Sequence, residues 1–320
     1  MKILVIPGLT LPAVNDAIVA QIHSASQGAD IVVVNPEEAL DEIHDAEIVL
    51  GFVNREMFLR AKALKWVQSI SSGVDMFLYD EFVNSQVVLT SEKGLVGDHL
   101  ADHGFGLLLM LTRQLRTSLL HGPESWNHRG EMRRQMIELT NSTMGVFGFG
   151  STGRGIAKRA AGFGMQVIAV DRDDVPISPE VSEVWRLDRF HDLLSQSDVV
   201  AICCPLTTET RGVFDAAAFN SMKRSAFLVN VTRGEVMVED DLVAALQGGT
   251  IRGAALDVTP REPLPSDSPL WTMDNVMMTP HTAGASQFRA QRNLDRFLHN
   301  LQRYLANEPL EGLIDKQLGY

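Results

Sequence analysis

Cysteine is nearly absent from this chain: of its 320 residues only Cys203 and Cys204 are cysteines, and they are neighbours in the sequence. Adjacent cysteines rarely form a disulfide with each other, so we expect no disulfide framework. Both lie in the apolar run DVVAICCP, which is typical of a buried strand. This cysteine usage favours a reducing, cytoplasmic compartment.

Long apolar runs and an excess of positive charge are missing as well. No run approaches the roughly 20 apolar residues that a membrane-spanning helix needs, and the opening MKILVIPG is too short for a signal peptide. Lys and Arg number 28 against 40 Asp and Glu, which gives a net charge of −12. Because nucleic-acid binding needs a basic face, we expect no nucleic-acid partner. Because no run is long enough to span a membrane, we expect no membrane partner either. A small anionic ligand stays open, since one or two arginines can hold it.

What the chain does contain is a regular alternation of strand-like and helix-like segments, which predicts an α/β architecture with parallel sheets. Its length suggests two domains. Five short apolar strands are expected at 2–8, 29–35, 46–52, 65–71 and 86–91, and six more at 144–150, 165–171, 198–204, 226–232, 253–258 and 275–280. A long buried helix is expected at 99–115 and a polar stretch at 121–143. A final helix within 285–310 is expected to pack back on the N-terminal domain.

The run VFGFGSTGRG, residues 146–155, places Gly148, Gly150 and Gly153 at the G-x-G-x-x-G spacing. An apolar strand precedes it and a helical pattern follows, which is the context that a dinucleotide-binding turn requires. The three glycines would permit the tight turn, the approach of the pyrophosphate and close packing of helix on strand. Asp171 ends the next strand and can accept hydrogen bonds from ribose hydroxyls while repelling a 2′-phosphate. NAD(H) is therefore favoured, and the adjacent Arg172 leaves NADP(H) open.

Three further residues follow predicted strands, at the sheet edge where open parallel sheets bind ligands: Arg233, Glu262 and His281. Reduction of a 2-oxo acid needs a cation for the carboxylate and ketone, and an acid that protonates the forming alkoxide. Histidine titrates near neutral pH and can donate and recover that proton. A carboxylate beside it would orient the imidazole, and arginine keeps its charge and grips carboxylates with a fork of donors. No metal site is predicted.

The sequence resembles the D-isomer-specific 2-hydroxyacid dehydrogenase family along nearly its whole length, most closely the glyoxylate/hydroxypyruvate reductase-like, broad 2-keto-acid reductase branch. The resemblance rests on WVQSISSGVD, GLVGDHLADH, the glycine run through AVDR, CCPLTTETRG, NVTRGEVMVEDDL, GAALDVTPREPLPSDSPLW and NVMMTPHTAG. It implies two Rossmann-like parallel-sheet domains, with a dinucleotide-binding domain at 99–284 inserted into a flavodoxin-like substrate domain at 1–98 plus 285–320. It also implies a homodimer held partly through an arm that includes Trp126.

The same resemblance implies roles for individual residues. Arg233, Glu262 and His281 become substrate cation, carboxylate partner and acid/base, and the main chain of Ser72, Gly73 and Val74 holds the substrate carboxylate. The implied cofactor-binding residues, besides the three glycines, are Ser151, Thr152, Asp171, Arg172, Pro205, Thr210, Val231, Thr232, Asp257 and Gly284. The substrate would be glyoxylate, hydroxypyruvate or a larger 2-oxo acid. Phe52, Val53, Met76 and Phe77 are candidates either for an apolar pocket wall or for core.

Some positions depart from the family pattern. Ser151 and Thr152 stand where the family often has Arg-Ile, Asp102 replaces a usual Glu, and Thr259 replaces a common aromatic residue. We interpret His99 and His103 as structural helix residues. Two other functions stay open: an NAD(H)-sensing, co-repressor-like binding protein, and a phosphoglycerate dehydrogenase whose phosphate would need a cation such as Arg55.

Overall fold

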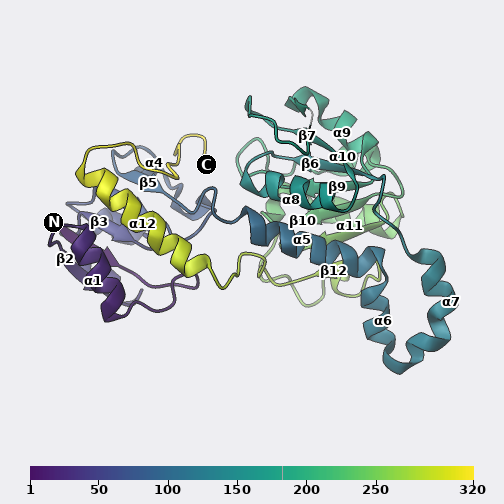
Figure 1. Cartoon of the computed structure of the whole chain (residues 1–320), viewed down its shortest axis with the longest axis horizontal. Coiled ribbons are helices and arrows are strands. Elements are labelled where there is room, and N and C mark those ends of the chain that lie inside the picture. Colours follow the sequence, from purple (N-terminus) through teal and green to yellow (C-terminus); the bar gives the residue numbers. More distant parts are fainter. Residues whose placement is uncertain (182) are drawn as a thin grey trace. The chain divides into compact units, whose positions relative to one another are not determined.

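The structure is a computed structural model that describes residues 1–181 and 183–320. The chain divides into two compact units, one formed by Met1–Val96 with Ala285–Tyr320 and the other by Gly97–Gly284 (Figure 1). These borders lie close to the sequence-based ones at 98 and 284. No helix in the described part of the chain combines the length and the apolarity that a membrane crossing requires.

The first unit is built on a five-stranded sheet in which every neighbouring pair is parallel. Its strands are β1 (Lys2–Val5), β2 (Asp30–Val33), β3 (Ile48–Leu50), β4 (Trp66–Gln68) and β5 (Val88–Thr90). They lie in the order β2-β1-β3-β4-β5, which is the flavodoxin-like order. All five strands expected from the sequence are present.

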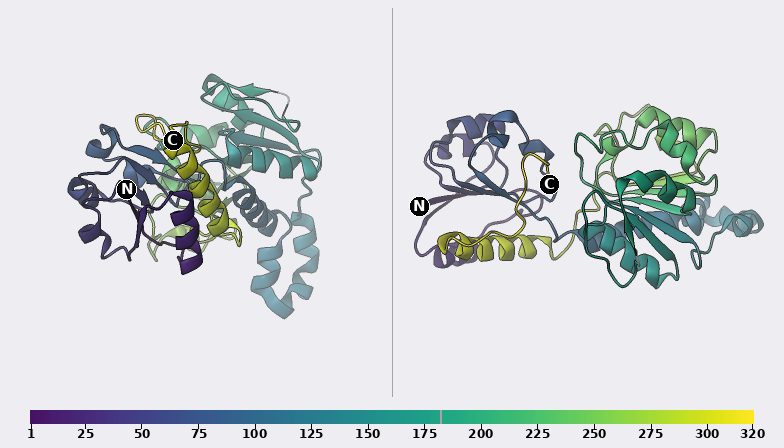
Figure 2. Two further views of the ribbon diagram at one scale, coloured as in Figure 1. Left: turned by 60° about the vertical axis from the view of Figure 1, so that its left-hand side comes forward. Right: turned by 90° about the horizontal axis from the view of Figure 1, so that it is seen from above.

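Helices cover both faces of this sheet because alternate strand residues point to opposite sides. On one face, α1 (Asp16–Ala25) and α12 (Arg289–Leu305) lie side by side over a core that includes Trp66 (Figure 2). On the other face lie α2 (Ala39–Glu42), α3 (Arg55–Arg60) and α4 (Asp80–Val83). The Trp66 ring stacks on Phe297 and Tyr304 of α12 at 5.4 Å each. The expected return of the final helix to the N-terminal domain is thereby confirmed.

The second unit contains a seven-stranded parallel sheet in the order β12-β11-β10-β9-β6-β7-β8. The strands are β6 (Thr143–Phe147), β7 (Gln166–Val170), β8 (Val184–Trp185), β9 (Val199–Ile202), β10 (Phe227–Asn230), β11 (Gly253–Leu256) and β12 (Val276–Met278). Renumbered within the unit, the first six strands follow the dinucleotide-binding order 3-2-1-4-5-6. The sequence predicted six strands, and β8 was missed because two residues at the sheet edge carry no recognisable apolar pattern.

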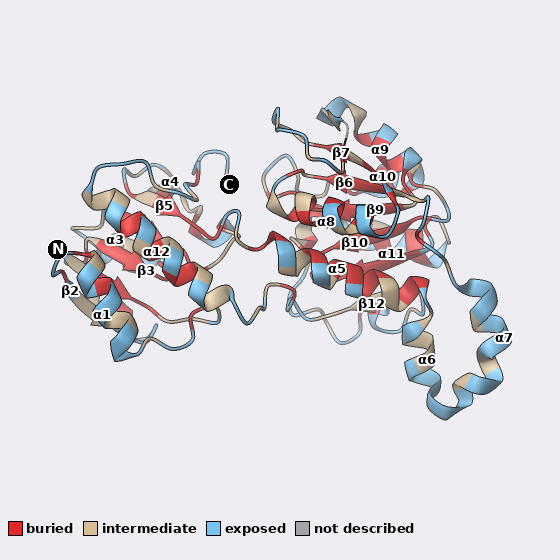
Figure 3. Cartoon of the chain, in the orientation of Figure 1, coloured by how far each residue is buried: buried red, intermediate tan, exposed pale blue. Residues whose placement is uncertain are grey.

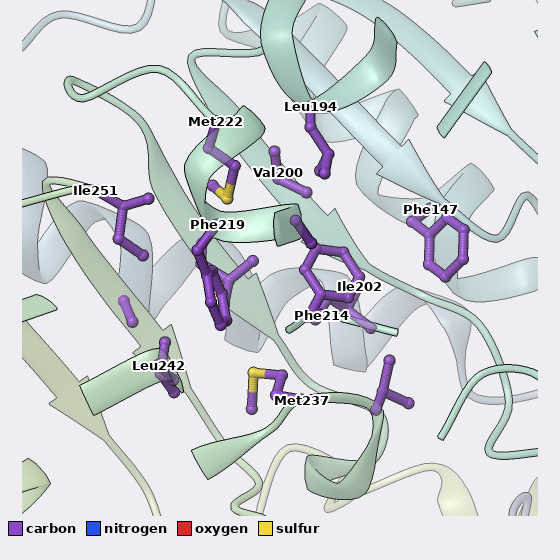
Figure 4. Packing of buried hydrophobic residues seen from close by; sticks show 14 of the residues in the cluster. Phe147, Leu194, Val200, Ile202, Phe214, Phe219, Met222, Met237, Leu242 and Ile251 are labelled. Atoms are coloured by element: carbon purple, nitrogen blue, oxygen red, sulfur yellow. The ribbon is translucent and has the colours of Figure 1, made fainter. Parts of the chain in front are cut away.

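This sheet is also packed on both faces, as Figure 3 shows by its buried strands. On one side lie α5 (Gly97–Thr112) and α8 (Ser151–Gly162). On the other lie α9 (Phe190–Gln196), α10 (Ala216–Ser221) and α11 (Glu239–Gln247), over a cluster that includes Phe214 and Phe219 (Figure 4). Short 3-10 helices occur at Asp75–Phe77, Gly122–Glu124, Leu187–Arg189, Gly234–Val236 and Pro269–Trp271. The cysteines are buried and free, as expected from their apolar run.

The stretch predicted to be merely polar is largely helical. It contains most of an arm formed by α6 (Leu115–His121) and α7 (Ser125–Gln135), whose residues are all exposed or half-buried (Figure 3). His121 and His128 stack between the two helices with ring centroids 4.0 Å apart. Apolar periodicity marks the face that a helix buries. Because α6 and α7 bury no residue, their sequence carries no such signal.

Candidate active site

The glycine run forms the turn between β6 and α8. Gly148 has φ +95°, which glycine adopts without strain, and its N–H donates to the carbonyl of Val170 at 2.8 Å. A Cβ on Gly153 would collide with the Gly148 carbonyl and lie 3.0 Å from the Val146 side chain. The start of α8 therefore packs against the end of β6 too closely for any residue other than glycine. A Cβ on Gly150 would meet no atom within 4 Å. The start of α8 therefore borders open space beside Gly150, and the N-terminus of a helix can hold a pyrophosphate.

Asp171 follows β7 and ties it to the glycine turn. Its carboxylate accepts hydrogen bonds from the N–H groups of Phe149, at 2.6 Å, and Asp173, at 2.9 Å. The Arg172 Nε lies 3.5 Å from the Asp173 carboxylate. Arg154, which the sequence reasoning did not single out, lies with its guanidinium 4.6 Å from the centre of the Phe149 ring and donates to the Pro176 carbonyl. The turn thus has the acid Asp171 beside it, with the cations Arg154 and Arg172 close in the sequence or in contact with the turn.

The other predicted cofactor residues follow the carboxyl ends of β9 to β12. The Thr210 hydroxyl donates to the Pro205 carbonyl at 2.7 Å. Asn230, also missed from the sequence, ends β10 and orders the next loop: its side-chain oxygen accepts the Thr232 N–H at 3.0 Å, and its side-chain nitrogen donates to the Arg233 carbonyl at 2.9 Å. Val231 is buried within this loop. Because all these strands are parallel, the segments emerge at one edge of the sheet.

His281 and Glu262 are brought together after β12 and β11. His281 Nδ1 lies 2.7 Å from Glu262 Oε2, and the other carboxylate oxygen accepts the Thr259 N–H at 3.1 Å. A carboxylate can only accept, so Nδ1 carries the hydrogen and Nε2 is the ring atom left for other chemistry. The two side chains are 44% and 37% exposed, so a ligand can reach them. His281 has φ +53°, a left-handed conformation that costs a non-glycine residue about 1 kcal/mol.

Asp257, at the end of β11, holds the segment that carries His281. Its main-chain carbonyl accepts the His281 N–H at 2.8 Å. Its carboxylate, buried with 1% exposure, accepts the N–H groups of Thr282 at 2.9 Å and Ala283 at 2.8 Å, and the Thr279 hydroxyl at 2.6 Å. Gly284 follows directly. Asp257 therefore supports the His281 turn rather than pointing to solvent.

Arg233 is half-buried in the loop that follows β10, three residues after Asn230, and its Nη1 donates to the Thr232 carbonyl at 2.9 Å. A Cβ on the next residue, Gly234, would clash with the Thr259 carbonyl, so the Arg233 loop lies against the loop that carries Glu262. Thr259 itself is buried, and its hydroxyl donates to the Arg261 carbonyl at 2.8 Å. In place of an aromatic side chain, Thr259 thus braces the Glu262 loop from within.

In the first unit, the predicted carboxylate-binding loop follows β4. Among the described residues, none of the N–H groups of Ser72, Gly73 and Val74 donates a hydrogen bond. The Ser71 hydroxyl donates to the Gly73 carbonyl and shapes the loop. These three main-chain N–H groups could therefore donate to an anion such as a carboxylate.

Two of the four candidates for an apolar pocket wall belong to the core of the first unit. Val53 and Phe77 are 0% and 1% exposed and belong to its buried cluster. Phe52 packs edge-on against Phe77 with ring centroids 5.1 Å apart. Met76, in contrast, is 55% exposed and available to a ligand.

The family model described as D-isomer specific 2-hydroxyacid dehydrogenase, NAD binding domain, matches residues 105–283. The chain is similar to a glyoxylate reductase of Thermofilum pendens, with 33% identity over 88% of this chain and 85% of the relative. It is also similar to a hydroxypyruvate reductase of Blautia hydrogenotrophica, with 30% identity over 86% and 87%.

Solved structures are also similar to this chain over nearly its whole length. The NADPH-dependent glyoxylate/hydroxypyruvate reductase of Sinorhizobium meliloti, in complex with NADP and sulfate, superposes with a TM-score of 0.81 at 26% identity and 100% coverage of both chains. The NAD-dependent formate dehydrogenase of Staphylococcus aureus, in complex with NAD, gives 0.77 at 26% identity over 98% of this chain and 99% of that one. With a family model over more than half its length and relatives of this identity along most of it, the chain belongs to the D-isomer-specific 2-hydroxyacid dehydrogenase family.

Proposed function

We propose that this protein reduces a 2-oxo acid to a 2-hydroxy acid, with His281 as the proton donor and Arg233 as the substrate cation. Family membership makes the chain an oxidoreductase that binds a nicotinamide cofactor. The observation that carries the proposal is the 2.7 Å contact between His281 Nδ1 and Glu262 Oε2. A histidine fixed in this way by a carboxylate presents Nε2 to a substrate, as acid–base catalysis requires.

The bound nicotinamide supplies or accepts the hydride, and the residues of the chain handle charge and protons. The His281 imidazolium gives the Nε2 proton to the forming alkoxide, and Glu262 stabilises the imidazolium before that step. Arg233 offers a permanent positive charge to the carboxylate and ketone oxygens of the substrate. We propose that the N–H groups of Ser72, Gly73 and Val74 hold the substrate carboxylate.

For the cofactor, we propose a preference for NAD(H). The support is the Asp171 carboxylate at the end of β7, where a 2′-phosphate would meet a negative charge. Arg172 and Arg154 lie close enough to this turn for NADP(H) to be accepted more weakly. Gly148, Gly150, Ser151, Thr152 and Gly153 would hold the pyrophosphate. Pro205, Thr210, Val231, Thr232 and Gly284 would line the remaining cofactor site, and the buried Asp257 would take part by holding the main chain at Thr282 and Ala283.

For the substrate, we propose glyoxylate, hydroxypyruvate or a larger 2-oxo acid. Relatives named for glyoxylate and hydroxypyruvate support the smaller compounds, and the exposed Met76 supports an apolar group. The phosphoglycerate alternative has less support because the Arg55 guanidinium forms a two-pronged ion pair with Glu81. A substrate phosphate would have to displace that carboxylate.

The roles of His281 and Glu262 are tested by two substitutions. We expect His281→Ala to lower kcat for 2-oxo acid reduction by roughly 10²–10⁴-fold, because the reaction loses its acid. Glu262→Gln keeps the size of the side chain but removes its charge, so it should lower kcat by about tenfold or more. Steady-state kinetics, with NADH affinity measured by fluorescence, checks both.

The matched control is Asp240→Asn, which removes one carboxylate charge from the exposed start of α11. It should leave both kcat and the affinity for NADH unchanged. Full turnover in His281→Ala would rule out His281 as the acid, whatever Glu262→Gln does.

We further propose a homodimer formed through the α6–α7 arm, in a reducing cytoplasmic compartment. The support is a set of large apolar side chains on the arm: Leu119, Leu120 and Trp126 are 72%, 70% and 76% exposed. Single exposed apolar residues are common, whereas several on one projecting element are typical of a protein interface. Two buried free cysteines suit the reducing compartment.

A further inference from the structure

His103, on the α5 helix, lies at the end of a chain of side-chain contacts that leads to the His281 turn. His103 Nε2 is 2.7 Å from the Thr279 hydroxyl, and that hydroxyl donates to Asp257 Oδ1 at 2.6 Å. His103 Nε2 is also 3.3 Å from the same carboxylate oxygen. All three residues belong to the second unit.

The direction of each hydrogen bond in this chain is fixed by chemistry. The Asp257 carboxylate can only accept, and Thr279 has a single hydroxyl hydrogen, which it gives to Asp257. The Thr279 oxygen must therefore accept from His103, so Nε2 of His103 carries a hydrogen. His103 thus acts as a donor to the buried carboxylate system, which is more specific than the structural helix role suggested by its sequence context.

Asp257 in turn binds the main chain at and after His281, the proposed proton donor. Its carbonyl binds the His281 N–H, and its carboxylate binds the N–H groups of Thr282 and Ala283. These bonds hold His281 in a left-handed conformation, with φ +53°, that a non-glycine side chain does not favour. A rotation of the Asp257 carboxylate would release the turn and the alignment of His281 with Glu262.

We propose that His103 is a positioning residue: by donating to Thr279 it fixes the Asp257 carboxylate and thereby holds His281 in reach of Glu262. The inference rests on the proposed function for its effect on turnover. Its structural part concerns only the hydrogen bonds within the second unit.

Two pairs of variants test the chain of contacts. His103→Leu removes the donor, whereas His103→Gln retains an N–H near the Nε2 position. Thr279→Val removes the hydroxyl at nearly constant shape, whereas Thr279→Ser keeps it. We expect His103→Leu and Thr279→Val each to lower kcat about tenfold or more while the affinity for NADH stays within about threefold, since His281 loses its alignment with Glu262. The two conservative variants should stay within about threefold of the wild type.

The double variant His103→Leu/Thr279→Val separates one shared path from two independent effects. Residues that act through one chain are non-additive, so the double variant should be no slower than the slower single one. A merely structural histidine would lower the amount of folded protein without lowering kcat per folded molecule. An unchanged kcat in Thr279→Val, or a His103→Gln variant as impaired as His103→Leu, would overturn the proposal.

Hydrogen exchange of the same variants keeps this inference distinct from the proposed function. If the wild type reduces no 2-oxo acid, the proposed function fails, and exchange of the amides in 279–284 decides the role of His103. Faster exchange there in His103→Leu than in His103→Gln, with α5 unchanged, supports the proposal. Equal exchange in the two variants overturns it.

Discussion

At the scale of single residues, the geometry of the site depends on which carboxylate oxygen of Glu262 and Asp257 accepts each hydrogen bond. Glu262 divides its two oxygens between His281 and the Thr259 N–H, so the carboxylate cannot turn away from the ring without losing a main-chain bond. Asp257 has the same kind of division, between Thr279 and two main-chain N–H groups. Such bonds to the main chain hold flexible carboxylate side chains as fixed acceptors.

The adjacent thiols give a residue-scale prediction. Burial raises the pKa of Cys204 to about 12 and raises the pKa of Cys203 as well. Because only the thiolate attacks a disulfide reagent, both thiols should be inert in the folded protein at pH 8 and should gain reactivity only as the pH approaches that value. Titration with an aromatic disulfide should detect no thiol in the native protein and two after unfolding in guanidinium. Reaction of the folded protein at the rate of free cysteine would contradict the burial.

Residue roles could be predicted from sequence only where a motif carried them. Arg233, Glu262 and His281 each follow a strand and match one reaction, so they could be named as candidates. The hydrogen bond between His103 and Thr279 joins positions 176 residues apart, and no local sequence pattern predicts it. Arg154 was likewise missed, because its contacts depend on how the turn after β7 folds back.

At the scale of secondary-structure elements, the β6–α8 turn decides whether a dinucleotide can bind. Its glycines differ in what surrounds them, and this difference yields a test. Gly153→Ala should lower the free energy of unfolding by about 1–3 kcal/mol, because its Cβ would meet the Gly148 carbonyl. Gly162→Ala, at the other end of α8, meets no atom within 4 Å and should be neutral or stabilising by up to about 1 kcal/mol. Urea unfolding measures both, and equal effects would contradict the packing described here.

Gly150→Ala extends the same test to the cofactor. With no neighbour within 4 Å, the new methyl group should change the free energy of unfolding by less than about 1 kcal/mol. It should nevertheless weaken NADH binding, since it would occupy the proposed approach of the pyrophosphate. A Gly150→Ala variant that binds NADH like the wild type would place the pyrophosphate elsewhere.

Elements were predictable to the extent that they bury a face. The long helix at 97–112 and the returning helix α12 each have apolar residues at helical spacing, and the glycine turn was recognised by the spacing of its glycines. The α6 and α7 helices bury nothing, and β8 is too short to have a pattern. Exposure and brevity remove the signal on which sequence-based prediction depends.

At the scale of the whole molecule, the proposed dimer gives a prediction of mass. Light scattering should report twice the chain mass, and replacing Leu119 and Leu120 by Glu should yield the single-chain mass by placing charges on the proposed interface. The control replaces Arg129 and Arg133, on α7 of the same arm, by Lys, which keeps the charge and should leave the dimer intact. A wild-type protein at the single-chain mass would contradict the proposal.

The two-unit organisation was also foreseeable, since a second series of strands begins after the 99–115 helix and the last helix returns to the first unit. What the sequence could not supply is the support beneath the site. The buried Asp257 carboxylate and the left-handed turn at His281 arise only once β11 and β12 lie side by side.

The central claim is tested most directly by the loss of reduced-nicotinamide absorbance in the presence of purified protein and a 2-oxo acid. NADH and NADPH would be supplied in turn with glyoxylate, hydroxypyruvate, pyruvate and bulkier branched or aromatic 2-oxo acids. The account predicts turnover with at least one of these acids, faster with NADH than with NADPH, and its loss in His281→Ala. Tight cofactor binding without turnover of any of them would contradict the reductase and favour a protein that senses the cofactor.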